Sequence, residues 1–244
     1  MSTFDPAKLF AESTFGDVVR SRRSVRRFTD TPISDEVLHA CLDIAMLAPN
    51  SSNLQPWQFF VIDSPSMREA VVKCCMSQNA AKTANRLIVC VGRGDTWQQN
   101  AKDNITYYPS KPVPKAVQTY YGKLMPFAFT RGALNVLSPV KWAAIQVQRQ
   151  VKGAAVDPYY TEADVKNWAL ISTALAAENL MLALRAYGFD SCPMGGFDEE
   201  QLSKVLGLNE HQYICMVIGA GERAEDGIYS EQYRFERERF VVTV

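Results

Sequence analysis

The chain has 244 residues, of which 47% are hydrophobic, and its 26 basic side chains balance 26 acidic ones. This length and apolar content predict one large domain, or a domain with an inserted subdomain. The neutral net charge argues against a dedicated nucleic-acid-binding protein, which usually carries a basic surplus. The N-terminus lacks a basic stretch followed by an apolar one, so we expect no signal peptide and a cytoplasmic location.

The cysteines and histidines do not form the patterns of a metal site. Six cysteines are scattered without a CxxC pair, and the only histidines, His39 and His211, are far apart in the sequence. We expect reduced thiols that fill the core, no bound metal and no Cys-His nucleophile. The longest apolar run, 168–187, contains Glu178 and Arg185, so it predicts a buried helix rather than a membrane span.

A cluster of arginines near the N-terminus forms a local positive field on this neutral chain. A serine, Ser24, stands among them, and the five arginines within eight residues are Arg20, Arg22, Arg23, Arg26 and Arg27. Guanidinium groups present a planar fork of donors that matches phosphate oxygens, and a hydroxyl adds one short donor. The cluster therefore predicts an anion site at a helix end, with a solvated basic surface as the alternative.

The second distinctive stretch, 49–56, reads P-N-S-S-N-L-Q-P and follows a predicted helix. Prolines fix both of its ends, and five short side chains carry amides or hydroxyls. Such a loop can offer donors and acceptors to a polar heterocycle, although an ordinary helix-to-strand connection is the alternative reading.

Capping signals and apolar patterns predict the regular elements. We expect helices at about 14–22, 34–48, 66–76, 161–187 and 198–207, and strands at 57–62, 87–92 and 213–219, with a short strand before Gly195. Residues 93–160 predict helices broken by loops, including one at 142–151. Their many aromatic residues suit a lid or pocket wall, or equally a peripheral packing layer.

Two features point to a second subunit. The helix at 162–187 is apolar on almost every side, so it must be covered on every side. The last five residues, 240–244, are β-formers at a chain end and need a sheet edge, which can belong to another protomer.

Four segments, taken together and in order, resemble the FMN-dependent nitroreductase family. They are R-R-S-V-R-R-F at 22–28, A-P-N-S-S-N-L-Q-P-W-Q-F at 48–59, C-P-M-G-G-F at 192–197 and R-E-R-F at 237–240. The resemblance implies an α+β fold with a central, mostly antiparallel sheet flanked by helices. It also implies an intertwined homodimer with an exchanged C-terminal strand, and one flavin-binding domain over 1–244 with a variable helical insertion at about 93–160.

The resemblance also implies which residues hold FMN. Arg22, Arg23 and Ser24 would contact the phosphate and ribityl chain, and Arg237 and Arg239 would close on the phosphate. Arg26, Asn79 and Lys82 would lie near the pyrimidine edge. The isoalloxazine would be lined by Pro193, Met194, Gly195 and Gly196, and from the other subunit by Pro49, Asn50, Ser51, Ser52, Asn53 and Gln55. Some members carry an acidic residue at the position of Gly195 and a lysine at that of Arg237.

The expected activity is ping-pong transfer of hydride from NADH or NADPH, through FMN, to a nitroaromatic or quinone-type acceptor. We expect no catalytic residue beyond the cofactor, no nucleic acid and no membrane. Cations at Arg26 and Lys82 would favour the negative charge of the reduced flavin. The alternatives are a related flavoenzyme (a reductive dehalogenase or a flavin-consuming enzyme), a non-catalytic flavin-binding protein, and an anion- or RNA-binding module.

Overall fold

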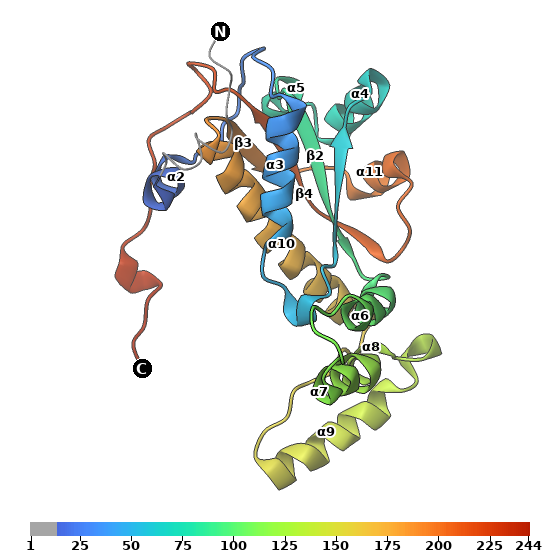
Figure 1. The fold of residues 1–244 in the computed structure, drawn as a ribbon. Coiled ribbons are helices and arrows are strands. Elements are labelled where there is room, and N and C mark those ends of the chain that lie inside the picture. Colours follow the sequence, from blue (N-terminus) through green and yellow to red (C-terminus); the bar gives the residue numbers. More distant parts are fainter. Residues whose placement is uncertain (1–13) are drawn as a thin grey trace.

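The structure, a computed structural model, describes residues 14–244 and is an α+β fold (Figure 1). Its strands are β1 (Trp57–Ile62), β2 (Arg86–Arg93), β3 (Asp190–Met194) and β4 (Gln212–Gly221). The helices outside the insertion are α2 (Phe15–Ser21), α3 (Asp35–Met46), α4 (Pro65–Cys74), α5 (Asn79–Lys82), α10 (Glu162–Ala186) and α11 (Glu199–Leu206), with a 3-10 turn, η4 (Arg237–Arg239), in the tail.

The four strands form one sheet in the order β1-β2-β4-β3, and every neighbouring pair is antiparallel. The prediction of a mostly antiparallel sheet is therefore confirmed. The central strand β2 alternates its side chains between two cores, as a strand with period 2 must. Leu87, Val89 and Val91 pack into one core, and Ile88 and Cys90 into the other.

Helices cover both faces of the sheet (Figure 1). The core with Ile88 and Cys90 is closed by α3 and α10, and the opposite core is closed by α4, α5 and α11. Helix α5 lies very close to β4. A Cβ atom at Gly219 would collide with the carbonyl oxygen of Ala80 in α5. The absent Cβ of this glycine is thus what allows α5 to approach the sheet.

Residues 94–160 form a separate helical layer at one end of the sheet (Figure 1). It comprises α6 (Trp97–Thr106), α7 (Lys115–Thr119), the π-helical turn η2 (Tyr120–Leu124), α8 (Met125–Phe129), η3 (Ala133–Asn135) and α9 (Ser138–Lys152). Its base packs as an aromatic cluster on α10, with Trp97 stacked on Phe129 at 4.9 Å and Trp168 edge-on to Phe129. We call residues 94–160 the insertion.

Several helix starts follow the predicted caps. Thr14, Ser34 and Asp198 each accept a hydrogen bond from the first turn of their helix, and Thr161 forms a full capping box with Asp164. The predicted cap at Ser66 is wrong. Ser64 caps α4 instead, because Pro65 suits the first helical position, where its missing N–H costs nothing.

The long helix α10 meets the length and composition of a membrane span, yet 56% of its most apolar window is buried inside the protein. The prediction of a buried helix holds for the side packed on the sheet. On another side Ile171 is 65% exposed and Leu175 44% exposed. These apolar side chains are uncovered in the single chain.

The C-terminal tail leaves the body of the protein after β4 and extends away from it (Figure 1). Residues 231–244 are all exposed, and the last five form no strand within the chain. The tail departs on the side of the molecule opposite to the edge strand β1 (Figure 1).

A buried carboxylate joins the ends of three elements. Asp190, which is 3% exposed at the start of β3, accepts hydrogen bonds from Arg185 of α10 at 3.2 Å and from Arg223 at 2.8 and 3.1 Å. Arg185 also donates to the hydroxyl of Ser21 at 2.9 Å, which ties in the end of α2.

We expect Asp190→Ala to lower the free energy of unfolding by about 3 kcal/mol, because it leaves two partly buried guanidinium groups without their counter-charge. Urea unfolding at pH 7 measures this change. Asp226→Ala, which removes the exposed Arg27–Asp226 pair, is the control and should cost less than about 1 kcal/mol. Equal effects of the two substitutions would contradict the role given to Asp190.

Candidate active site

The arginine cluster runs alongside β3 as a short extended segment. Ser24 forms a parallel bridge with Ser191, and the N–H of Val25 donates to the carbonyl oxygen of Ser191 at 3.0 Å. Val25 is fully buried in the core. Because successive side chains of an extended segment point to opposite sides, burying Val25 turns Ser24 and Arg26 away from the core.

The segment opens into a cavity of about 370 Å³, shared with residues 228–234 of the tail. Arg23 donates to the carbonyl oxygen of Ser230 at 2.5 Å, and the guanidinium of Arg26 lies 5.9 Å from the ring centre of Tyr229. Residues on the cavity wall include Arg22, Arg23, Ser24, Arg26, Glu231 and Arg234. The structure thus brings Arg22, Arg23 and Ser24, predicted for the phosphate and ribityl chain, together with Arg26, predicted for the pyrimidine edge.

Arg22 and Arg26 have no ion pair within the part of the chain that the structure describes. The neighbouring Arg27 differs, because it points to Asp226 at 2.6 Å. Two unpaired guanidinium groups and a hydroxyl on one cavity wall fit a phosphate group, which accepts several charge-assisted hydrogen bonds at once.

The Gly195–Gly196 turn follows β3 and lies next to the start of α5. Gln78 donates from its side chain to the carbonyl oxygen of Gly196 at 2.8 Å. A Cβ on Gly195 would meet nothing within 4 Å, so the backbone here is open to a flat ligand. On β3, burial raises the pKa of the Cys192 thiol, and the positive charge of Arg26 partly opposes this.

Other predicted residues lie apart from this cavity in the single chain. Lys82 lines a different cavity, of about 430 Å³, with Phe28, Arg68 and Arg86. Arg237 and Arg239 are on the exposed tail, where Arg239 stacks on Phe235 at 4.3 Å. Their contacts with a phosphate remain predictions, as does the place of Lys82 and the exposed Asn79 near the pyrimidine edge.

The loop at 49–56 has an unusual backbone that its own side chains support. Ser52, Asn53 and Gln55 all have positive φ values, of 62°, 49° and 44°. The side-chain oxygen of Asn50 accepts from the backbone N–H of Gln55 at 2.8 Å, which closes the turn, and Leu54 anchors it in the core. Left-handed backbone at non-glycine residues is costly and persists only where its surroundings hold it in place.

The insertion supplies that support. Asn53 and Asn104 of α6 bond each other in both directions, at 2.8 and 2.9 Å, and Asn100 donates to the carbonyl oxygen of Leu54 at 2.7 Å. From η2, the hydroxyl of Tyr120 lies 2.7 Å from that of Ser52, and Tyr121 donates to the carbonyl oxygen of Ser52 at 3.0 Å. We call these four residues of the insertion the loop clamp.

The clamp changes the interpretation of the loop. The side chains of Asn50 and Asn53 shape or hold the loop itself, whereas Ser51 and Gln55 are exposed. Sequence reasoning missed the clamp, the Gln78 contact and the tail residues 228–234. Only the spacing of Asn100 and Asn104, four residues apart on one helix face, was a usable signal.

We expect Asn104→Ala to speed hydrogen exchange at residues 50–55 by about tenfold or more, because it removes two hydrogen bonds worth about 1 kcal/mol each. Mass spectrometry of the exchanged peptide measures this. The matched control is Gln99→Ala on the same helix, whose side chain bonds only Asp103. Unchanged exchange in the Asn104 variant would show that the loop holds its shape without the clamp.

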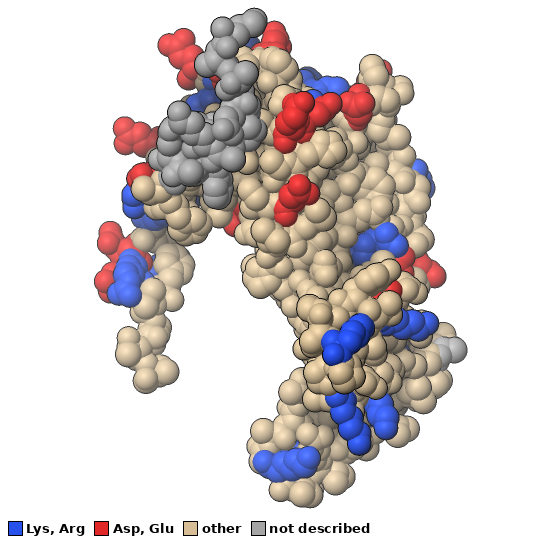
Figure 2. Space-filling view, in the orientation of Figure 1, with Lys and Arg blue, Asp and Glu red and all other residues tan. Residues whose placement is uncertain are grey.

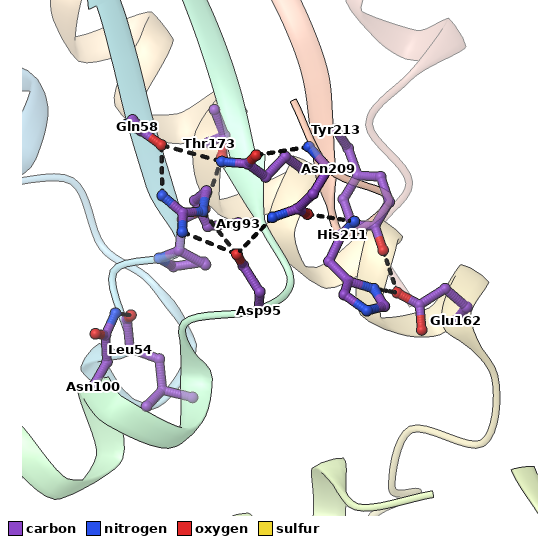
Figure 3. A network of polar contacts seen from close by, with 12 residues as sticks. Leu54, Gln58, Arg93, Asp95, Asn100, Glu162, Thr173, Asn209, His211 and Tyr213 are labelled. Carbon is purple, nitrogen blue, oxygen red and sulfur yellow. Dashed lines mark hydrogen bonds and ion pairs between the residues drawn. The ribbon is translucent and has the colours of Figure 1, made fainter. Parts of the chain in front are cut away.

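A polar network anchors both ends of the insertion to the sheet (Figure 3). At its start, Arg93 bonds Asp95 at 2.7 and 2.9 Å and reaches Gln58 on β1 at 2.5 Å. At its end, Glu162 of α10 accepts from Tyr213 on β4 and pairs with Arg131 of the insertion. The layer that clamps the loop is therefore itself fixed to three strands.

The same network shifts the acid–base properties of its members. Burial and the hydrogen bond to Glu162 raise the pKa of Tyr213, so its hydroxyl stays a donor. Partial burial would raise the pKa of Glu162, but hydrogen bonds from Tyr213 and His211 and the charge of Arg131 lower it overall. Glu162 thus stays ionised, and its contribution to stability is lost only as the pH falls through its lowered pKa.

Comparison with known proteins shows the family of this chain. The model of the family described as Nitroreductase matches residues 19–222. The chain belongs to the nitroreductase family. The match includes the arginine segment, the clamped loop and the Gly195–Gly196 turn, and it stops before η4.

Relatives match over most of their length. YdgI of Bacillus subtilis, classed among the NAD(P)H nitroreductases, is 28% identical over 88% of this chain and 91% of its own. An enone reductase of conjugated linoleic acid biosynthesis from Lactiplantibacillus plantarum is 25% identical over 94% of each. A nitroreductase-type protein from Exiguobacterium sibiricum, solved in complex with FMN, superposes with a TM-score of 0.71 over 95% of this chain and 98% of its own, at 24% identity.

Proposed function

We propose that this protein passes hydride from NADH or NADPH to a nitroaromatic or quinone-type acceptor by ping-pong turnover in one pocket. At the coarser level, the chain is an FMN-dependent NAD(P)H oxidoreductase of the nitroreductase family. The enone reductase among its relatives adds α,β-unsaturated carbonyl compounds to the acceptors worth testing. We place the protein in the cytoplasm, in keeping with six free thiols.

The observation that carries this proposal is that the arginine segment lines its cavity alongside β3, the strand that leads into the Gly195–Gly196 turn. Arg22 and Ser24 would bind the phosphate and ribityl chain of FMN, and Arg26 would lie near its pyrimidine edge. The open backbone at Gly195 would lie against the ring system and keep water away from one of its faces. FMN, when bound, accepts and donates the hydride, so the protein needs no acid, base or nucleophile of its own.

A second subunit would complete the site. β3 is covered at its free edge by the bridge between Ser24 and Ser191, whereas β1 is an edge strand with no partner on its outer side in the described chain. The tail of one chain points away from its own β1 (Figure 1). We infer that residues 240–244 pair with the sheet of another copy, and that loop 49–55 of that copy faces the flavin, with the insertion as a lid.

Arg22→Ala combined with Arg237→Ala should yield protein that purifies without the yellow flavin spectrum and does not oxidise NAD(P)H. Each charge-assisted hydrogen bond is worth about 1.5–3 kcal/mol, so the loss of two should weaken FMN binding by about 100-fold or more. Arg27→Ala is the control, because Arg27 is paired with Asp226 and lies outside the cavity. A yellow, active double variant would refute the phosphate assignment.

Val242→Pro tests the exchanged strand. Proline cannot donate to a strand ladder, so we expect this variant to shift the protein from dimer toward monomer. Val242→Thr keeps both the N–H and the β-branched side chain and should leave the dimer intact. Light scattering coupled to size-exclusion chromatography measures the mass. If the proline variant stays as dimeric as the threonine variant, the tail does not join the sheet of a partner.

A further inference from the structure

Charge is unevenly divided between the insertion and the rest of this neutral chain. Residues 94–160 contain eight basic and three acidic residues, which leaves 18 basic and 23 acidic residues elsewhere. The insertion therefore carries a formal charge of +5 and the remainder −5. A zero total conceals this separation.

Most of the basic side chains of the insertion are exposed and form no ion pair with a described residue. Five lysines are exposed and take part in no ion pair with any described residue, and they are Lys102, Lys111, Lys115, Lys123 and Lys152. Among the basic residues of the insertion, only Arg131 and Arg149 pair with a carboxylate of the described chain, Arg131 with Glu162 of α10 and Arg149 with Asp157 of the insertion itself. Figure 2 shows Lys and Arg over the lower lobe formed by the insertion, and Asp and Glu gathered on the upper part.

Two of these lysines, Lys115 and Lys123, lie next to the loop clamp in the chain. Tyr120 and Tyr121 contact Ser52, and Lys123 follows them in the same turn, η2. Lys115 begins α7, which runs directly into η2. Under the proposed function, Ser52 faces the flavin of the partner, so this part of the insertion borders the entrance used by both substrates.

We propose that the insertion lysines, Lys115 and Lys123 above all, form an electrostatic docking surface for the phosphates of the pyridine nucleotide. This surface would increase the rate at which the nucleotide associates and reduces the flavin. The increase would be larger for NADPH than for NADH, because NADPH carries one more phosphate group. The proposal rests on the proposed function and extends it to the choice of reductant.

The physical basis is that a cluster of lysines attracts a negatively charged nucleotide even when the protein as a whole has no net charge. Unpaired charges of one sign around a cleft raise the local concentration of a counter-charged substrate and can increase its association rate 10-fold or more. Salt weakens this attraction, because the screening length falls from about 30 Å at 0.01 M ionic strength to about 3 Å at 1 M. A neutral acceptor in the same pocket feels no such attraction and serves as an internal reference.

The test compares two double variants of the FMN-loaded protein that remove equal charge. Lys115→Gln/Lys123→Gln neutralises the proposed surface. Lys73→Gln/Lys204→Gln neutralises two exposed lysines on α4 and α11, helices that lie away from the insertion (Figure 1). Bound flavin and thermal stability should match the wild type in both variants, because all four side chains are exposed.

Two quantities are measured at increasing ionic strength. The first is the second-order rate constant for anaerobic bleaching of the flavin by NADPH and by NADH, with re-oxidation by neutral menadione measured in the same way. The second is the dissociation constant of NADP⁺, by calorimetry. In the wild type and the α4/α11 variant, we expect the NADPH constant to fall steeply with salt, the NADH constant less, and the menadione constant to stay flat.

The insertion variant should lose about 10-fold of the NADPH rate constant at low salt, bind NADP⁺ correspondingly more weakly, and show a shallower salt dependence. Identical salt slopes in the two variants, or a wild-type preference for NADH that salt does not change, would overturn the proposal. Protein that binds no flavin, or that NAD(P)H does not bleach, would instead overturn the proposed function. The two failures are thus distinguishable.

Discussion

The candidate site depends on one backbone contact, the hydrogen bond from Val25 to Ser191. It extends the arginine segment along the free edge of β3, and the alternation of an extended chain then buries Val25 and presents Ser24 and Arg26 to the cavity. The buried carboxylate of Asp190, one residue before Ser191, holds α10 and the end of β4 at the same point. Unpaired guanidinium groups repel one another, so they can be gathered on a surface only where the backbone that carries them is fixed in this way.

The contacts that fix the insertion to the sheet serve both the clamped loop and the proposed docking surface. The insertion forms hydrogen bonds to loop 49–56, in which Ser52, Asn53 and Gln55 have left-handed backbone, and it is itself anchored at Asp95 and Glu162 to the ends of the sheet. A charged layer on a flexible tether would lose its directional effect, because the charges would average over many positions. The rigid polar network of Figure 3 is therefore what gives the lysines of the insertion a defined place relative to the loop.

The parts of this molecule that could be predicted from sequence are those set by local chemistry. Caps such as Thr161 with Asp164, and the β-branched pattern of β2, satisfy nearby backbone groups or follow a fixed period, so residues a few positions apart determine them. The arginine segment and the Gly-Gly turn were predicted as candidate ligand residues; the structure pairs the segment with β3, which ends just before the turn, and their binding roles stay predictions. The loop clamp could not be predicted, because Asn53 and Asn104 are brought together by the packing of α6 on the sheet end rather than by any pattern in the chain. The cap of α4 was predicted two residues too late. Ser64 and Ser66 are both possible caps, and Pro65 favours Ser64 because proline suits the first helical position.

The single chain leaves several surfaces that no described residue covers, and they agree on what is missing. Ile171 and Leu175 on α10 are apolar and exposed, β1 has an open edge, and the β-forming tail lies far from that edge. Each feature alone is common, but together they are complementary. The β-forming tail can pair with an open strand edge such as that of β1, and the apolar face of α10 can pack against a second apolar face. The proposed twofold pairing of two chains would satisfy all three at once, because each copy would offer the surface that the other copy lacks. In the proposed dimer, loop 49–55 of one chain would form the second wall of the other chain's site, so catalysis would belong to the pair of chains rather than to either one.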